Sequence, residues 1–436
     1  MEQIHLIRNG YLVNPGNGEE GYADIHIRDG LIEKIVFKSE EKAQLDANLE
    51  EEGVINAAGC YVFPGLVDAH SHFRDPGFTH KEDILTGAKA AAAGGYTSVV
   101  LMCNTKPVVD TTETLQYVLE KGRKTDIHVY SCGTVTMGLK GEVLTDMQAL
   151  KDAGAVGFTD DGIPLMDEEV LTRAMEECAR LDRPISLHEE NKDLIENNGI
   201  NRGKASEHYR VGGSPKEAEI SLIERDLKIA IKTGAALDVQ HVSARESVDL
   251  IREAVKKQGE NRRIHAEATP QHFTLTEDAL IEKGADAKLN PPLRTEEDRL
   301  GIIEGLRDNV IDLIATDHAP HTKEEKAVLP ITSAPSGMIG LETALSLSYE
   351  KLVLEAGIPL PEVIAKLTCN PASVYGLHNA GTVRSGMDAD LCIFDPSAEE
   401  IKDHFESKSW NSPFLGRRMK GKVTATVCGG RIVYRA

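Results

Sequence analysis

The sequence predicts an α/β fold, a (β/α)8 barrel of the TIM type with a small composite β domain formed from both chain ends. Two patterns lead to this prediction. Apolar strand-like segments alternate with amphipathic helical segments, and both chain ends consist of short strands and turns. The length of 436 residues also favours one large domain and one smaller domain, because it exceeds what most single cores hold.

Eight segments have the pattern of a barrel strand, and most of them are apolar at the start and polar at the end. They are 61–72, 97–104, 126–134, 155–162, 184–191, 237–243, 263–272 and 311–321. Helical periodicity is found between them, at 80–95, 110–122, 145–154, 167–182 and 246–259. A doubly wound open sheet is the alternative fold, but no GxGxxG motif follows the first strand.

The two chain ends carry hairpin signals. Residues 23–36 alternate around an Asp-Gly pair, and residues 423–434 form a second hairpin pattern around Gly429-Gly430. Another strand is expected at 388–396. Since neither end is long enough for a stable sheet of its own, we expect residues 1–60 and 380–436 to pair into one β domain, with the barrel at 61–379. The acidic stretch 40–52 is expected to be a solvated loop or edge.

The composition restricts the classes of partner and the compartment. A formal net charge of -21 argues against nucleic acid or an anionic membrane as a partner, although a local metal and arginine cluster can still attract a small anion. The seven cysteines are scattered without a CxxC pair, which is typical of a reduced cytosolic protein. With no signal-peptide pattern and no long apolar run, we expect a soluble cytoplasmic protein.

The motif HSHFR at 70–74 follows the first strand-like run. Side chains alternate along a strand, so His70, His72 and Arg74 share one face. Two imidazoles about 7 Å apart along a strand can close on one metal ion, and zinc accepts such ligands readily. For an isolated HxH motif, a solvated strand edge would be the alternative interpretation.

Other strand ends favour the metal site over a solvated edge. Polar residues end most of the predicted strands, and parallel barrel strands bring these ends to one face, where barrel enzymes keep their active sites. The candidate ligands are His70, His72, Asp161, His188, His241 and Asp317. This set exceeds the needs of one tetrahedral zinc, and two neighbouring ions would need a bridging anionic ligand.

This arrangement resembles the amidohydrolase superfamily, which has HxH on strand one, histidines on strands five and six, and an aspartate on strand eight. Many members bridge two metals with a carbamylated lysine on strand four, but here that strand is GFTDDG, with Thr159 near the position of the lysine. Asp161 is our candidate for the bridging ligand, and Asp160 is the alternative.

Five stretches in order are similar to the class I bacterial dihydroorotases that lack this lysine: DAHSHFRDPG, LMCNTKPVVD, GFTDDG, LNPPLRTEEDR and DLIATDHAPHTKEEK. The resemblance implies reversible hydrolysis of dihydroorotate to N-carbamoyl-aspartate in pyrimidine synthesis, with Zn²⁺ as the cofactor, as two ions per chain or as one. It implies a homodimer that associates with aspartate transcarbamoylase, and Asp317 as general base and acid. The substrate would be held by Arg74, Asn104, Asn290, His321, Ser336 and Gly337.

Physical chemistry agrees with these roles. Arginine is the fork-shaped cation that pairs with carboxylates, and dihydroorotate carries one. Two positions depart from the family pattern: Ser336 stands where a Phe is common, and Glu189 stands where a Cys is common. A hydantoinase, allantoinase or dihydropyrimidinase is the nearest alternative. A catalytically inactive partner of aspartate transcarbamoylase is the alternative from another class.

Overall fold

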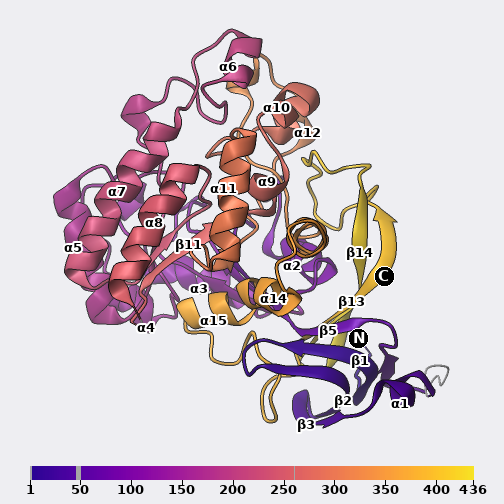
Figure 1. Cartoon of the computed structure of the whole chain (residues 1–436). Helices are drawn as coiled ribbons and strands as arrows, with labels where there is room; N and C mark the ends of the chain where they lie inside the picture. Colours follow the sequence, from indigo (N-terminus) through magenta and orange to yellow (C-terminus); the bar gives the residue numbers. More distant parts are fainter. Residues whose placement is uncertain (1, 46–50, 260) are drawn as a thin grey trace.

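Parallel strands form a barrel in the computed structural model, which describes residues 2–45, 51–259 and 261–436 (Figure 1). The barrel strands, in order, are β6 (Leu66–Ser71), β7 (Tyr96–Leu101), β8 (His128–Ser131), β9 (Ile185–Leu187), β10 (Leu237–Val239), β11 (Ile264–Ala268) and β12 (Leu313–Ile314). Strands β6 to β8 form one parallel sheet, and β9 to β12 form a second. The predicted barrel fold is confirmed.

The two barrel sheets are joined at two places. On one side Phe158 bridges in parallel to Gly133, just after β8, and to Ile185 at the start of β9. The predicted strand 155–162 is therefore too long: the segment follows the sheet from Val156 to Thr159, whose backbone groups bond to Ser131, Gly133 and the start of β9, and only Phe158 forms a bridge on both sides. Asp160, two residues after Phe158, directs its side chain at the segment that follows β8. Its Oδ1 accepts hydrogen bonds from the backbone N–H groups of Val135 (2.8 Å) and Thr136 (3.1 Å).

The other junction joins the first barrel strand to the last. Asp68, fully buried on β6, accepts hydrogen bonds from the backbone N–H (2.9 Å) and the hydroxyl (2.6 Å) of Thr316. Further along, the backbone N–H of His72 donates to the carbonyl of His318 at 2.9 Å. These bonds fix the ends of β6 and β12 side by side.

The predicted helices are present and surround the barrel strands (Figure 1). Aspartate and threonine N-caps, such as Asp83, Thr111 and Asp167, set the starts of three of them by accepting from free N–H groups of the first turn. The helices that the structure describes are α2 (Ile84–Ala93), α3 (Thr112–Gly122), α4 (Met147–Asp152), α5 (Glu168–Leu181), α6 (Lys204–Tyr209), α7 (Lys216–Thr233), α8 (Arg245–Gln258), α9 (Pro270–Thr274), α10 (Asp278–Lys283), α11 (Glu296–Arg307), α12 (Lys323–Lys326), α13 (Ala344–Ser348), α14 (Leu360–Leu367) and α15 (Cys369–Val374), besides α1 (Glu40–Leu45), which lies beside the N-terminal strands and not around the barrel.

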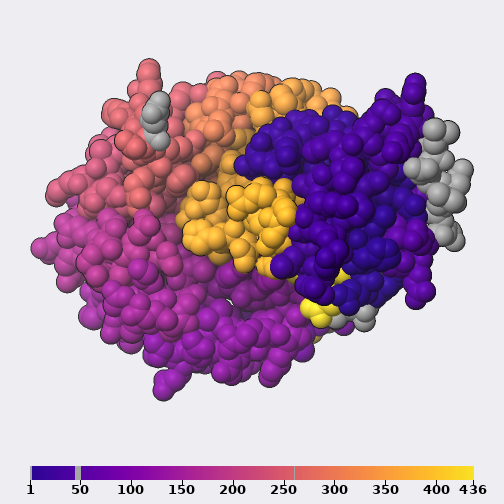
Figure 2. Space-filling view, turned by 90° about the horizontal axis from the view of Figure 1, so that it is seen from below, coloured from indigo at the N-terminus to yellow at the C-terminus, as the bar shows by residue number. Residues whose placement is uncertain are grey.

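Strands from both chain ends form one further sheet outside the barrel. They are β1 (Leu6–Asn14), β2 (Glu19–Arg28), β3 (Leu31–Phe37), β4 (Val54–Asn56), β5 (Tyr61–Pro64), β13 (Leu391–Ile401), β14 (Arg418–Cys428) and β15 (Arg431–Arg435). Their order is β15-β14-β13-β5-β1-β2-β3, with β4 beside β1. Figure 2 shows the N-terminal residues in indigo gathered at one side of the molecule, beside C-terminal residues in orange and yellow.

Residues 61–64 lie in this terminal sheet, although the sequence places them in the barrel. Strand β5 pairs with β1 on one side and with β13 on the other. Only Gly65 separates β5 from β6, so the first barrel strand continues directly from the middle of the terminal sheet. The acidic stretch 40–52 also differs from the expected loop, since 40–45 form α1, while residues 46–50 lie outside the described part of the chain.

Two hairpin turns from opposite ends of the sequence meet in this sheet. Asp29-Gly30 joins β2 to β3, and Gly429-Gly430 joins β14 to β15, with positive φ at all four residues. A Cβ on Gly30 would lie 2.9 Å from the carbonyl oxygen of Gly429, and one on Gly430 would lie 3.0 Å from the Cα of Gly30. Glycine is therefore needed at position 30 for two reasons, the backbone conformation and the contact.

Among the described residues, no helix is both long and apolar enough to cross a bilayer.

The turn contact predicts that Gly30→Ala destabilises the protein more than Gly59→Ala. Both glycines have φ +80, but a Cβ on Gly59 has no atom within 4 Å. Gly59→Ala should cost only the left-handed backbone penalty of about 1–2 kcal/mol, and Gly30→Ala should cost more. Urea denaturation of the two variants measures the difference in the free energy of unfolding. Equal losses would show that the two turns do not support each other.

Candidate active site

A cavity of about 200 Å³ opens at the carboxyl ends of the barrel strands. Its wall contains all but one of the site residues predicted from the sequence. The lining residues are His72, Arg74, Asn104, Asp161, Gly162, His188, His241, Asn290, Asp317, Ala319, His321, Ser336 and Gly337. The exception, His70, is fully buried beneath the cavity. Its Nε2 atom lies 3.5 Å from Asp161 Oδ1 and 3.6 Å from Asp317 Oδ1.

The two histidines of the HxH motif each use one ring nitrogen for orientation. His70 Nδ1 donates to Glu267 Oε2 at 3.0 Å, and His72 Nδ1 donates to Asn104 Oδ1 at 3.0 Å. Their Nε2 atoms face the same carboxylate oxygen, Asp317 Oδ1, at 3.6 Å and 3.1 Å. Such an acceptor on the far nitrogen fixes the tautomer that leaves Nε2 free as a ligand.

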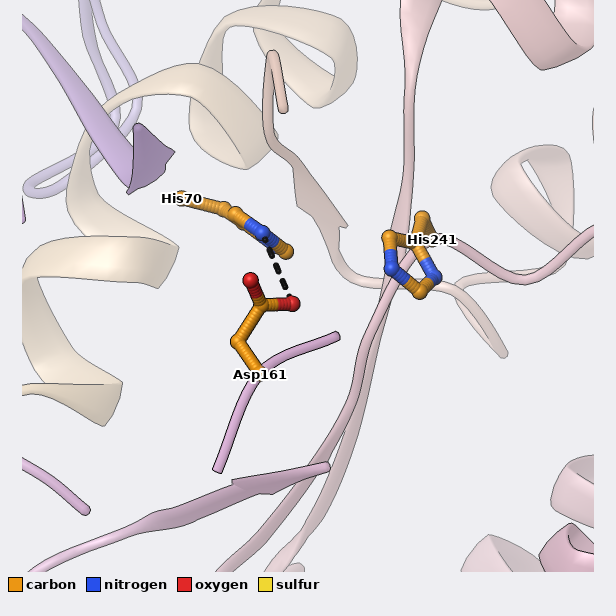
Figure 3. Close-up of side chains that lie close together, drawn as sticks. All are labelled: His70, Asp161 and His241. Carbon is orange, nitrogen blue, oxygen red and sulfur yellow. Dashed lines mark ion pairs between the residues drawn. The ribbon is translucent and has the colours of Figure 1, made fainter. Parts of the chain in front are cut away.

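Asp161 lies between the histidines, and Asp160 does not. Figure 3 shows the Asp161 carboxylate directed at His70, with His241 to the right of this pair. Asp161 Oδ1 is 3.5 Å from His70 Nε2, and Asp161 Oδ2 is 3.5 Å from His72 Nε2. Burial would raise the pKa of Asp161, but the three histidines His70, His72 and His188 outweigh it and hold that pKa well below its usual range. Both carboxylate oxygens of Asp160 are used by Val135 and Thr136.

His188 and His241 form the other half of the group. His188 Nε2 donates to Glu190 Oε2 at 3.0 Å, and its Nδ1 lies 3.0 Å from His241 Nε2. Burial and the neighbouring His188 and His70 lower the pKa of His241 well below its ordinary value. This direction favours the neutral imidazole, the form in which histidine binds metals.

Three residues of the site have positive φ although they are not glycine: Arg74 (59°), His241 (30°) and Asp317 (46°). Such conformations are uncommon for side-chain-bearing residues and cost free energy, so the surrounding structure must hold them. All three come just after a barrel strand, where the chain turns outward. The turn directs their side chains into the cavity.

The donor set fits divalent metal ions. Nitrogen and carboxylate oxygen atoms are the ligands that zinc accepts, and the groups His70/Asp161/His241 and His70/His72/Asp317 each place their ligand atoms within 4.8 Å of one another. The Nε2 atom of His70 is buried without a hydrogen-bond partner among the described residues. A ligand atom left unpaired in the interior is costly unless a metal ion completes it.

The remaining candidates line the cavity in different ways. Arg74 donates from Nε to the carbonyl of Pro320 at 3.3 Å, and that is the one hydrogen bond of its guanidinium within the described ranges. The Oδ1 atom of Asn290 is buried and has no hydrogen-bond partner there either. Asn104 is engaged with the ligands themselves, because its Nδ2 donates to Asp161 Oδ2 at 2.9 Å while its Oδ1 accepts from His72.

His321 supports the loop that carries Ser336 and Gly337. Its Nε2 donates to the carbonyl of Ser336 at 2.9 Å, and Lys81 Nζ donates to its Nδ1 at 3.2 Å. Burial, together with the cations Arg74, Lys81 and Lys326, lowers the pKa of His321 to about 2. Three cations therefore act on His321, and one of them, Arg74, lines the cavity beside it, in a chain that is acidic overall.

Sequence reasoning missed the residues that hold the ligands in place. Glu267, fully buried on β11, orients His70, and Glu190 orients His188. Gly162 and Ala319 also line the cavity. A carboxylate in the middle of an apolar strand, as in RIHAEA, was the available signal for Glu267. Glu189, in contrast, is buried beside Arg225 and Asp226. Burial is the larger cause and the negative charge of Asp226 the next, and together they raise the pKa of Glu189 well above its ordinary value.

Comparison with known proteins agrees with this geometry. The family model described as "Amidohydrolase family" matches residues 61–433. A dihydroorotase of Clostridium acetobutylicum is 49% identical over 431 residues, which cover 98% of this chain and 99% of the relative. A dihydroorotase of Clostridioides difficile is 47% identical, covering 99% of this chain and 100% of the relative.

Solved structures share the fold across the whole chain. An L-hydantoinase (dihydropyrimidinase) from Arthrobacter aurescens superposes with a TM-score of 0.86 at 26% identity, covering 100% of this chain and 96% of that one. A dihydropyrimidinase from Brevibacillus agri gives a TM-score of 0.82 at 24% identity, covering 99% and 95%. The chain belongs to the amidohydrolase family, and within it to the bacterial dihydroorotases.

Proposed function

We propose that this enzyme is a dihydroorotase, which reversibly hydrolyses (S)-dihydroorotate to N-carbamoyl-L-aspartate in de novo pyrimidine (UMP) biosynthesis. The observation that supports it best is the presence of Arg74 in the same small cavity as the histidine and aspartate group. A cyclic amide with a carboxylate needs both a hydrolytic centre and a fixed cation. The dihydroorotases that are 47–49% identical to this chain support the same assignment.

We propose two Zn²⁺ ions in this site. His70, His72, Asp161, His188, His241 and Asp317 would hold them. Asp161 contacts both halves of this set, because its Oδ1 lies 3.5 Å from His70 Nε2 and 4.0 Å from His188 Nδ1, and its Oδ2 lies 3.5 Å from His72 Nε2. Bound zinc lowers the pKa of a water ligand toward 7 and polarises a carbonyl group. Asp161 is our bridging ligand, because Asp160 is used elsewhere.

Asp317 is proposed to move the proton. Its Oδ1 lies 3.1 Å from His72 Nε2, and its carboxylate faces the cavity. In the forward direction Asp317 accepts a proton from the attacking water as the new C–O bond forms. It then gives that proton to the amide nitrogen as the C–N bond breaks, acting as general base and then acid.

The basic wall of the cavity is proposed to hold the substrate carboxylate. Arg74 provides the fork, and Lys81 and Lys326 add positive charge from behind. Asn290 can donate to or accept from the ring through its free amide, and the Ser336–Gly337 loop presents backbone groups. His321 and Asn104 complete the wall, and each also positions a neighbour, the loop in one case and the metal ligands in the other.

Three further proposals come from the family resemblance. We propose a homodimer, an association with aspartate transcarbamoylase and a cytoplasmic location. The seven cysteines are all free in the structure, which supports a reducing compartment. An inactive scaffold is disfavoured, because five of the six candidate metal ligands line one cavity, and the sixth, His70, lies 3.5 Å from one of them, Asp161.

Asp161→Asn should remove at least one metal ion per chain, since the amide lacks the charge of the bridging carboxylate. Elemental analysis of the purified variant measures this loss. Asp160→Asn is the matched control, and it should keep the metal content while lowering the thermal unfolding midpoint. The opposite pattern, with metal lost only from the Asp160 variant, would mean that Asp160 is the bridging ligand.

Asp317→Asn keeps the size of the side chain and removes its basicity. We expect kcat per bound metal to fall by at least ~10²-fold, the lower range for loss of general acid–base catalysis. Steady-state kinetics together with metal analysis of the same sample separates proton transfer from metal binding. Near-normal turnover in the metal-loaded variant would rule out Asp317 as the proton carrier.

Arg74→Ala should lower kcat/KM for dihydroorotate by roughly 30- to 5,000-fold. Losing the partner of a desolvated carboxylate costs about 2–5 kcal/mol, and each factor of ten corresponds to about 1.36 kcal/mol. Dihydrouracil, the same ring without the carboxylate, is the control substrate. The wild-type enzyme should barely open it, and Arg74→Ala should not make that activity much worse.

Comparable wild-type activity on dihydrouracil or hydantoin would contradict this assignment. The enzyme would then be a general cyclic amidase of the hydantoinase or dihydropyrimidinase kind.

A further inference from the structure

A second group of metal-ligand side chains lies outside the active site, where the barrel meets the terminal sheet. It consists of His128, Asp390 and Cys428, whose ligand atoms all lie within 4.8 Å of one another. His128 is the first residue of β8, Asp390 directly precedes β13, and Cys428 ends β14. Because His128 is at the amino end of its strand, this group is at the opposite end of the barrel from the active site.

His128 and Asp390 face each other at ion-pair distance, and the sulfur of Cys428 lies in the same group. His128 Nε2 lies 2.9 Å from Asp390 Oδ2, yet neither atom has a hydrogen-bond partner of acceptable geometry within the described chain. The other oxygen of Asp390 is fixed, because it accepts from the backbone N–H of Gly429 at 2.8 Å. Asp390 is only 6% exposed, and one of its carboxylate oxygens, one ring nitrogen of His128 and the sulfur of Cys428 face one another within 4.8 Å.

We propose that His128, Asp390 and Cys428 form a Zn²⁺ site. An imidazole nitrogen, a carboxylate oxygen and a thiolate are the three ligand types of zinc in proteins, whereas Ca²⁺ and Mg²⁺ prefer oxygen alone. Three protein ligands leave one tetrahedral position for water. His128 and Cys428 both line a cavity of about 330 Å³, together with Tyr130 and Arg431 among others, so an ion can reach the group from solvent.

The charges around the group bear on this assignment. Asp388 adds negative potential at His128 and Cys428, while Arg431 favours the thiolate form of Cys428 but opposes a cation. Burial, assisted by Asp390, raises the pKa of the Cys428 thiol, so zinc must displace a proton to bind. Binding would tie β8 of the barrel to β13 and β14 of the terminal sheet.

Cobalt provides the test, because a thiolate ligand gives Co²⁺ a charge-transfer absorption band in the near ultraviolet. No cysteine is among the active-site ligand candidates, so this band reports on the second group alone. The intact enzyme is titrated with Co²⁺ at neutral pH and then with Zn²⁺. We expect a band that saturates at one Co²⁺ per chain and disappears when Zn²⁺ replaces it.

Cys428→Ser should abolish the band and leave dihydroorotate hydrolysis in place. Cys392→Ser is the matched control, and it should keep the band. Cys392 is also buried, on the neighbouring strand β13, but it belongs to none of the metal-ligand groups among the described residues. A band that survives in Cys428→Ser, or that is absent from the active wild-type enzyme at saturating Co²⁺, overturns the proposal.

His128→Gln is the second variant, in case Cys428→Ser does not fold. The side chain of His128 is 36% exposed, so its replacement disturbs packing little. Loss of one of three ligands should weaken Co²⁺ binding at the thiolate band by at least about tenfold, as even second-shell changes do. Unchanged affinity in this variant also overturns the proposal.

Discussion

Closure of the barrel between its first and last strands is the contact on which the site depends. A fully buried carboxylate, Asp68, receives the backbone N–H and the hydroxyl of Thr316, one residue before Asp317. Burial raises the pKa of Asp68, and its hydrogen bonds with Ser71 and Thr316 oppose that rise in part. Because Asp68 and His70 share one face of the same strand, this bond sets the distance between the HxH motif and Asp317.

The interior of the site contains much charge for a protein core. Three of the candidate ligand histidines each donate a hydrogen bond from one ring nitrogen to a separate acceptor. The acceptor is Glu267 for His70, Asn104 for His72 and Glu190 for His188. Buried polar networks are stable only when their members are satisfied. The residues behind the ligands therefore determine which nitrogen of each ring faces the cavity.

Much of the fold and the site could be predicted from the sequence. Strand and helix periodicity located the barrel, and the Asp29-Gly30 and Gly429-Gly430 pairs located the two hairpins. The length of the fourth strand was overestimated, because the apolar residues at its start gave no sign that the side chain of Asp160 would bond to Val135. The first strand was assigned as one element, since periodicity cannot show that Gly65 divides it between two sheets.

Orientation was the part of the site that the sequence could not provide. The positions of His321 and Asn104 at strand ends indicated that they would reach the cavity, and they do. Their hydrogen bonds to Ser336 and to the metal-ligand candidates depend on residues far away along the chain. The support of His70 by Glu267 similarly joins two strands that are 197 residues apart in sequence.

The place of β5 in the middle of the terminal sheet has a consequence for synthesis on the ribosome. Strand β5 pairs with β13, and β13 starts at Leu391, more than three hundred residues after β5 ends at Pro64. At about 5–20 residues per second, the edge of β5 waits roughly 16–65 s for its partner. During that time an apolar strand edge next to the nascent barrel is open to other chains, so chaperones have their main opportunity to protect this protein before its last strands emerge.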